Sequence, residues 1–267
     1  MEQLQAFGMQ KPLLLLFGAG CLISCHKDAS NPVNKWTWFG TQNTAVYNYV
    51  LINANQVLSK SDTEELHVGV SAAFIDSNNN QVTIVRALSV NNLLIEPGRD
   101  FTYNYDYSNG EANKGFQLFG SKVLITIRGS EEADTVSNSI YVSKRLTTVI
   151  ENYPDTVSLN NGIQLQWTPD SDNAWGNVMI QLFYFSSLSR EADSTMPEKI
   201  STVNITTPDN GSYTLLKSDL KTFPKNAFVG ITIARGTQNE AILPLSRKRV
   251  YYFSSASVST PPVRLTQ

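Results

Sequence analysis

Residues 163–185 of the chain read IQLQWTPDSDNAWGNVMIQLFYF. Up to Trp167, apolar and polar side chains alternate at every second position, which is the pattern of a strand with one buried face. The alternation ends at Pro169, where Pro followed by Asp favours a turn. Residues 178–185 then form an almost continuous apolar run, as a strand covered on both faces would. This stretch therefore predicts two strands joined by a turn.

The same two-residue period recurs on both sides of this stretch, and no segment has a convincing helical spacing of three and four. Only residues 47–58 leave a strand and a short helix both open. From residue 147 onward, short strands separated by turn signals are typical of an immunoglobulin-like sandwich. The sequence therefore predicts an all-β fold with two consecutive β-sandwich domains, over residues 39–146 and 147–267.

The composition excludes several classes of protein. The 267 residues carry 21 basic and 23 acidic side chains, a net charge of -2, so the basic surplus of a nucleic-acid-binding protein is absent. A structural zinc site needs four Cys and His ligands close together and a disulfide framework needs several cysteine pairs, so two cysteines and two histidines argue against both. With 41% hydrophobic and 16% charged residues, the chain can bury a core and is globular.

Residues 13–24 are apolar and uncharged, and Lys11 stands just before them. The run is too short to cross a membrane as a helix, which needs about 20 residues, but it has the length of a secretory apolar region. Its end, Leu22-Ile23-Ser24-Cys25, resembles a bacterial lipobox. That resemblance implies a signal peptide over residues 1–24, cleaved before Cys25, and attachment to the membrane through the acylated Cys25.

Alternatives for this segment remain open. Cys21 is a weaker acylation candidate because it lies within the apolar run, and a plain signal peptide could be cut near Ala29. Translation could begin at Met1 or at Met9.

The predicted tether, residues 25–38, begins the mature chain. Its Lys27-Asp28 pair partly resembles the short charged export signal of Bacteroidetes lipoproteins, although a second acidic residue is missing. The resemblance implies a lipid anchor in the outer membrane with the protein on the cell surface; the alternative is that it faces the periplasm.

The second half of the chain resembles a fibronectin type III domain. The resemblance rests on Trp167-Thr168-Pro169, on Leu220 followed by Pro224, and on the strand at 228–233. It implies a tryptophan packed in the core of the sandwich. Phe228 stands where that family has a tyrosine, so the hydrogen bond of the tyrosine corner is expected to be missing. The first half is similar to the β-domain that precedes such modules in uncharacterised Bacteroidetes lipoproteins, and no activity comes with that similarity.

No catalytic constellation is visible in the sequence. His67 is the histidine outside the tether, it lies at the start of a predicted strand, and no nucleophile-elbow pattern accompanies it. The segment Asp76-Ser77-Asn78-Asn79-Asn80 imitates the opening of a calcium loop but lacks its glycine and its distal glutamate. We therefore predict no catalytic residue, no metal site and no cofactor. A pair of carboxylates for glycoside hydrolysis remains an alternative, because separation in space is not readable from sequence.

Aromatic residues provide the main signal for binding. Phe101, Tyr103, Tyr105 and Tyr107 share one face of a predicted strand. Phe101 and Tyr103 are expected in the core, whereas Tyr105 and Tyr107 are equally consistent with the core and with an exposed stacking platform. Trp175 lies at a predicted loop tip, where it either contacts a ligand or folds over the end of the sandwich.

Three short motifs, each an Asp followed by Ser or Thr, resemble the O-glycan acceptor sites of exported Bacteroidetes proteins, and they mark Thr135, Thr156 and Ser194. Taken together, the sequence favours a non-catalytic, lipid-anchored envelope protein that binds a glycan or a protein partner. A carboxylate-dependent polysaccharide hydrolase and a structural spacer or assembly subunit are the alternatives.

Overall fold

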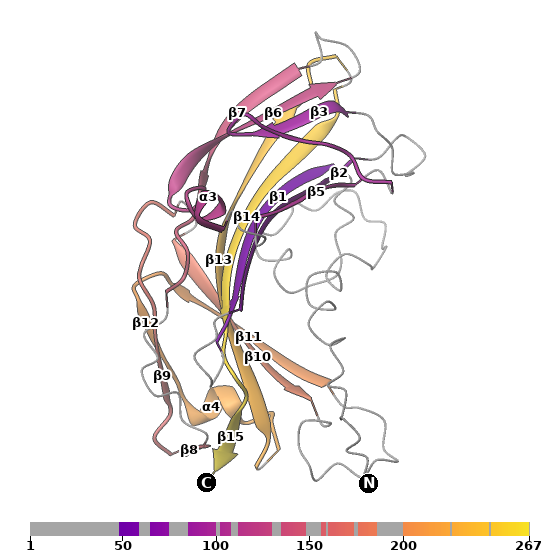
Figure 1. Cartoon of the computed structure of the whole chain (residues 1–267). Helices are drawn as coiled ribbons and strands as arrows, with labels where there is room; N and C mark the ends of the chain where they lie inside the picture. Colours follow the sequence, from indigo (N-terminus) through magenta and orange to yellow (C-terminus); the bar gives the residue numbers. More distant parts are fainter. Residues whose placement is uncertain are drawn as a thin grey trace, which may run out of the picture. The chain divides into compact units, whose positions relative to one another are not determined.

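The computed structural model describes residues 48–266 apart from 59–64, 75–84, 100–101, 108–111, 130–134, 148–155, 159, 174–175, 186–199, 225 and 246. The fold is all-β and sandwich-like, as predicted (Figure 1). The predicted signal peptide, Cys25 and the predicted tether lie outside the described residues. So do Trp175 and Ser194.

The largest sheet has nine strands. Seven of them follow the order β11 (Ile200–Pro208), β10 (Asn177–Phe185), β13 (Phe228–Ile242), β14 (Arg249–Ser259), β1 (Tyr49–Val57), β2 (Glu65–Ala73) and β5 (Tyr103–Asp106). The short strands β15 (Val263–Thr266) and β8 (Thr156–Ser158) join beside β13. Residues 47–58 had left strand and helix open, and the structure places a strand there. Its Val50, Ile52 and Ala54 are buried, as the two-residue period of a half-buried strand requires.

Two smaller sheets face this large one. A four-stranded sheet has the order β4 (Leu93–Ile95), β3 (Val85–Val90), β6 (Ser121–Gly129) and β7 (Thr135–Val142). A two-stranded sheet pairs β12 (Ser212–Leu215) with β9 (Ile163–Gln166). The described helices, α3 (Ala112–Phe116) and α4 (Lys217–Leu220), are each about one turn long.

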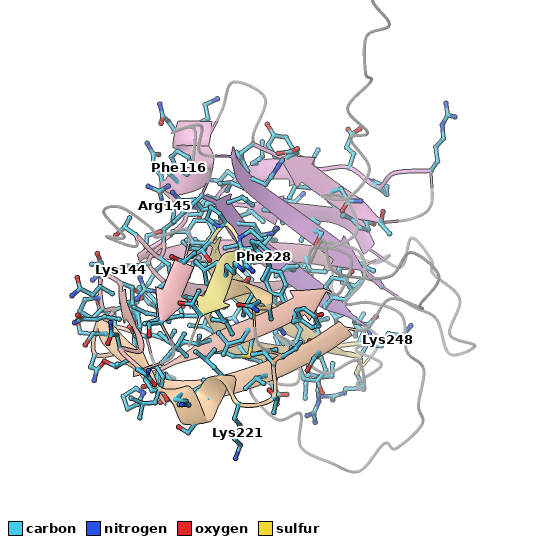
Figure 2. All side chains as sticks on the ribbon, turned by 90° about the horizontal axis from the view of Figure 1, so that it is seen from below. Phe116, Lys144, Arg145, Lys221, Phe228 and Lys248 are labelled. Atoms are coloured by element: carbon cyan, nitrogen blue, oxygen red, sulfur yellow. The ribbon has the colours of Figure 1, made fainter. Side chains whose placement is uncertain are left out.

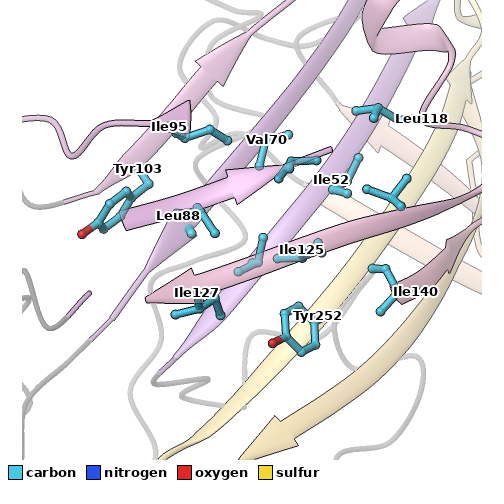
Figure 3. Packing of buried hydrophobic residues seen from close by; sticks show 14 of the residues in the cluster. Ile52, Val70, Leu88, Ile95, Tyr103, Leu118, Ile125, Ile127, Ile140 and Tyr252 are labelled. Atoms are coloured by element: carbon cyan, nitrogen blue, oxygen red, sulfur yellow. The ribbon is translucent and has the colours of Figure 1, made fainter. Parts of the chain in front are cut away.

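Each small sheet encloses a core against the same face of the large sheet. The first core packs β3, β4, β6 and β7 onto β1, β2, β5 and the start of β14, and Figure 3 shows Ile125 and Ile127 of β6 among its members. The second core packs β9 and β12 onto β10, β13 and the end of β14, and includes the predicted core tryptophan, Trp167, which is 4% exposed. Burial of these apolar side chains supplies most of the stabilisation of both halves.

The two halves of the chain share strands, which the sequence did not indicate. β1 belongs to the first half and pairs in parallel with β14 of the second half, from Tyr49 opposite Tyr251 to Val57 opposite Ser259. β14 also pairs with β13 along eleven residues. Residues on both sides of the predicted boundary at 147 share cores: Val250 and Tyr252 of β14 belong to the first core, and Leu146 belongs to the second. The division into domains at that residue stays a prediction.

Candidate functional site

The tyrosines of β5, and Tyr107 just after it, lie on the core face of the large sheet. Tyr103 is fully buried and Tyr107 is 4% exposed, while Tyr105 is half-buried and packs against the same core. The rings of Tyr105 and Tyr107 meet edge to face, with centroids 4.7 Å apart. Tyr107 is therefore part of the core. The alternative of an exposed stacking platform that includes Tyr107 is wrong.

The opposite face of β5 carries polar side chains. Asn104 and Asp106 alternate with the tyrosines and are exposed. Asn104 pairs with Ser71 of β2, and Asp106 pairs with Gly69. We call the polar patch that continues across the neighbouring strands the polar face. It comprises Asn53, Asn55, His67, Ser71, Asn104, Asp106 and Ser257.

Strand register brings the members of the polar face together. Asn53 lies opposite Gly69, and Asn55 lies opposite His67 on one side and Ser257 on the other. The Ser257 hydroxyl donates a 2.7 Å hydrogen bond to Oδ1 of Asn55. A Cβ at Gly69 would lie 3.2 Å from the backbone carbonyl oxygen of Tyr105, so β2 and β5 approach closely at this glycine. His67, Asn104 and Asp106 of the polar face are exposed, and Asn53, Asn55, Ser71 and Ser257 are half-buried. Ser255 and Phe253, on the same side of β14, are buried.

Aromatic side chains border the polar face at one end of the same strands. Tyr49 and Tyr251 lie opposite each other in register, on the same side of the sheet as Asn53 because side chains alternate. The Tyr251 ring stacks on Phe253 with centroids 6.2 Å apart and planes inclined by 18°. Burial raises the pKa of Tyr49, so its phenol is neutral near pH 7. The border therefore combines apolar ring surface with hydroxyl groups.

A second polar group lies inside the molecule, between the two cores. Arg235 of β13 is fully buried, and its Nη1 lies 3.0 Å from Oδ2 of Asp209, whose side chain is 2% exposed. The rest of the guanidinium donates to three backbone carbonyls: Nε to Lys144 (2.8 Å), Nη2 to Arg145 (2.7 Å) and Nη1 to Thr168 (2.8 Å). A buried arginine with this many partners is satisfied, and its position is tightly constrained.

The carboxylates of this cluster are equally engaged. Asp209 accepts a 2.8 Å hydrogen bond from Nε1 of Trp167. Asp170 accepts from the hydroxyl of Tyr141 (2.8 Å) and from the backbone N–H of Lys144 (2.8 Å). Burial, and then the bond to Asp170, raise the pKa of Tyr141 far above its ordinary value. These groups therefore form a tightly hydrogen-bonded cluster in the interior.

The cluster fixes the connection between the two cores. Arg235 binds the carbonyls of Lys144 and Arg145, which lie on that connection. The Arg145 guanidinium also lies over the ring of Phe116 in α3, 4.1 Å from its centroid (Figure 2). The sequence predicted only a turn at Pro169 and Asp170, and this role of Asp170 and Asp209 was not anticipated. The available signal was Arg235 itself, which follows Ile231 and Ile233 at the next core-facing position of a strand.

The predicted O-glycan sites Thr135 and Thr156 lie apart from both groups. Thr135 begins β7 and is half-buried, and Thr156 begins β8 and is exposed. His67 is exposed on β2, within the polar face. Among the described residues, no group of three or more His, Cys, Asp or Glu could hold a metal ion. In the same part of the chain, no helix combines the length and the apolar character needed to cross a membrane.

No protein-family model matches the chain, and no curated protein is significantly similar to it.

Proposed function

We propose that this chain is a non-catalytic, lipid-anchored protein of the outer membrane that binds a glycan at the cell surface. The observation that carries the proposal is the polar face of the large sheet with its border of Tyr49 and Tyr251. A rigid sheet holds these side chains in fixed positions, which lowers the entropy lost when a ligand binds.

The chemistry of the polar face suits a sugar. Neighbouring hydroxyl groups of a sugar both donate and accept hydrogen bonds, and a carboxamide such as that of Asn53 does the same. The Asp106 carboxylate accepts from hydroxyls, and half-buried tyrosine rings offer apolar surface to the C–H face of a sugar ring. The polar face therefore fits a neutral oligosaccharide lying along the strands better than it fits a large apolar ligand.

Membrane attachment is proposed to occur through Cys25. Two or three acyl chains on one cysteine hold a protein durably, whereas a single chain holds it only marginally. Metabolic labelling with radioactive palmitate should label the wild type and the Cys21→Ser variant but not Cys25→Ser. Equal labelling of Cys25→Ser and the wild type would rule out this anchor.

Glycan binding is tested with the full chain on an array of bacterial and host oligosaccharides, followed by titration with the best ligand. The test variant is Asn53→Ala with Asn55→Ala. Its matched control is Gln164→Ala with Gln166→Ala, which removes two exposed carboxamides at the same spacing on β9 of the small sheet. We expect the first pair to weaken binding by at least tenfold, because each net hydrogen bond contributes about 1 kcal/mol.

The control pair should leave affinity unchanged. Equal affinity of both double variants and the wild type would show that the polar face does not bind the glycan. If no oligosaccharide binds saturably and a pull-down on the full chain instead yields a protein that depends on Asn53 and Asn55, the ligand is a protein and the glycan assignment is wrong.

A further inference from the structure

Strand β11 is the outermost strand at one end of the nine-stranded sheet. It runs for nine residues, Ile200–Pro208, and among the described strands it pairs with β10 alone. Its sequence, ISTVNITTP, contains no charged residue. A long edge strand without charge presents a row of backbone N–H and C=O groups to which another strand can pair.

The other long edge is protected. β7 ends the four-stranded sheet, but near its end the carbonyl of Tyr141 accepts a 2.8 Å hydrogen bond from the Thr237 hydroxyl of β13. Just beyond β7, the backbone N–H of Ser143 faces the Ser254 hydroxyl at 3.5 Å. The remaining edge strands of the described residues, β4, β5, β8, β9 and β12, have three or four residues each. β11 is therefore the long edge of the described sheets that carries no such cover.

The middle of β11 is nearly the same when read in either direction. Residues 202–206 read TVNIT, so the sequence is symmetric about Asn204 apart from the exchange of Val203 for Ile205. Thr202, Asn204 and Thr206 are exposed on one face of the sheet. Val203 and Ile205 lie on the other face and pack half-buried against the second core. A strand of this kind can pair with a copy of itself without changing which side chains face each side of the sheet.

We propose that two copies of this chain associate by antiparallel pairing of their β11 strands about Asn204. In that register Thr202 faces Thr206 of the partner copy and Val203 faces the partner's Ile205. β-branched side chains opposite one another are favourable cross-strand pairs. The contact is symmetric, so both copies use the same surface, and it joins two nine-stranded sheets into one. It lies at the opposite end of the strand order from β5 of the polar face.

Disulfide cross-linking tests both the contact and its register. The full chain carries Cys21→Ser and Cys25→Ser, so that neither native cysteine reacts, and it is held in non-ionic detergent. Asn204→Cys is introduced on this background and oxidised mildly. Its two copies would stand directly opposite each other, with Cβ atoms about 5 Å apart, within reach of a disulfide. Ser139→Cys is the matched control, an exposed residue on the protected edge strand β7.

The register predicts a further result. Thr202→Cys alone should cross-link poorly, because its two copies lie four residues apart along the strands, or about 14 Å. A mixture of Thr202→Cys and Thr206→Cys should form mixed dimers at least about tenfold faster than either alone, because disulfides need close Cβ atoms. Asn204→Cys that cross-links no faster than Ser139→Cys, or Thr202→Cys that cross-links alone as fast as the mixture, overturns the proposal.

Sedimentation of the wild-type chain gives an independent readout if a cysteine variant fails to fold. The measured mass should rise toward that of a dimer as concentration increases. The Asn204→Lys variant should keep the mass of a monomer, because two like charges would face each other in the pair. A wild-type mass that stays at one monomer up to about 100 μM, the range of weak pairwise association, contradicts the proposal.

Discussion

The first core and the second core lie on the same face of one sheet, yet they handle buried polar groups differently. The first core is apolar apart from tyrosine hydroxyls, and among the described residues that of Tyr252 is buried without a hydrogen-bond partner. The second core ends at Arg235 and Asp209, which are buried and fully partnered. Apolar burial stabilises each half, whereas the paired charges fix how the connecting segment is held against both.

The largest effect is expected where the two cores meet. Arg235→Met keeps the length of the side chain but leaves Asp209 and three backbone carbonyls without their donor. Breaking a buried ion pair by removing one partner costs about 3 to 5 kcal/mol, so the free energy of unfolding should fall by that amount. Urea unfolding followed by circular dichroism measures it. A loss below about 1 kcal/mol, typical of an exposed ion pair, would show that the cluster is not a constraint.

Each core can be weakened by itself with a matched truncation. Ile125→Ala removes a fully buried side chain from the first core, and Leu182→Ala does so in the second. Each should cost about 3 kcal/mol, since the truncation loses transfer energy and leaves a cavity. The two costs should be similar because both side chains are completely buried. A cost near zero for one of them would mean that its core is loosely packed.

The hydroxyl of Tyr252 in the first core, unpartnered among the described residues, predicts that the free energy of unfolding depends on pH. Burial raises the pKa of Tyr252 from its ordinary value near 10 to about 12. The folded state therefore keeps the proton more tightly than the unfolded state, and stability that is present below pH 10 is lost as pH rises toward 12. The loss is about 2 to 3 kcal/mol, at 1.36 kcal/mol per pKa unit.

Tyr252→Phe should remove that part of the alkaline loss. Near pH 7 its free energy of unfolding should equal or slightly exceed that of the wild type, because the deleted hydroxyl has no partner among the described residues. Urea titrations of both proteins between pH 7 and 12 provide the measurement. Identical pH profiles would show that Tyr252 ionises as easily when folded as when unfolded.

The smallest effect is expected at the surface. Arg249 and Glu240 form an ion pair at 3.1 Å, with both side chains about half exposed. Arg249→Met should leave the free energy of unfolding unchanged within error, because water screens such a pair. This variant is the control for Arg235→Met, as it makes the same substitution in an exposed ion pair, whereas Arg235 is buried and also donates to three backbone carbonyls. If both variants lost similar free energies of unfolding, burial of the ion pair would not explain the effect of Arg235→Met.

Local patterns in the sequence were sufficient to predict the class of fold. Alternation of apolar residues indicated the strand that ends before Trp167, because burial on one face leaves a mark every second residue. Pairing between distant strands leaves no such mark, so the parallel pairing of β1 with β14 was not predictable. The partners of Arg235 come from three separate segments, and only the unusual position of the arginine was visible.

The candidate site was only half predictable. The sequence indicated Tyr105 and Tyr107 as binding candidates, and in the structure both pack in or against the first core. The residues that alternate with them, Asn104 and Asp106, form part of the polar face. Asparagine and serine are common on the solvent side of a strand, so their presence alone does not indicate a site. The strand register, which brings Asn53, Asn55 and Ser257 together, identifies the polar face.

We infer that the shared sheet makes the two cores a single cooperative unit. Hydrogen exchange of the full chain, read by mass spectrometry for peptides from β6 and from β10, tests it in the Ile125→Ala variant. Backbone amides that exchange only by global unfolding lose protection together. We predict that the slowest amides of β10 in the second core lose as much protection as those of β6 in the first. If β10 keeps its wild-type protection while β6 loses it, the two cores unfold separately, which contradicts a single cooperative unit.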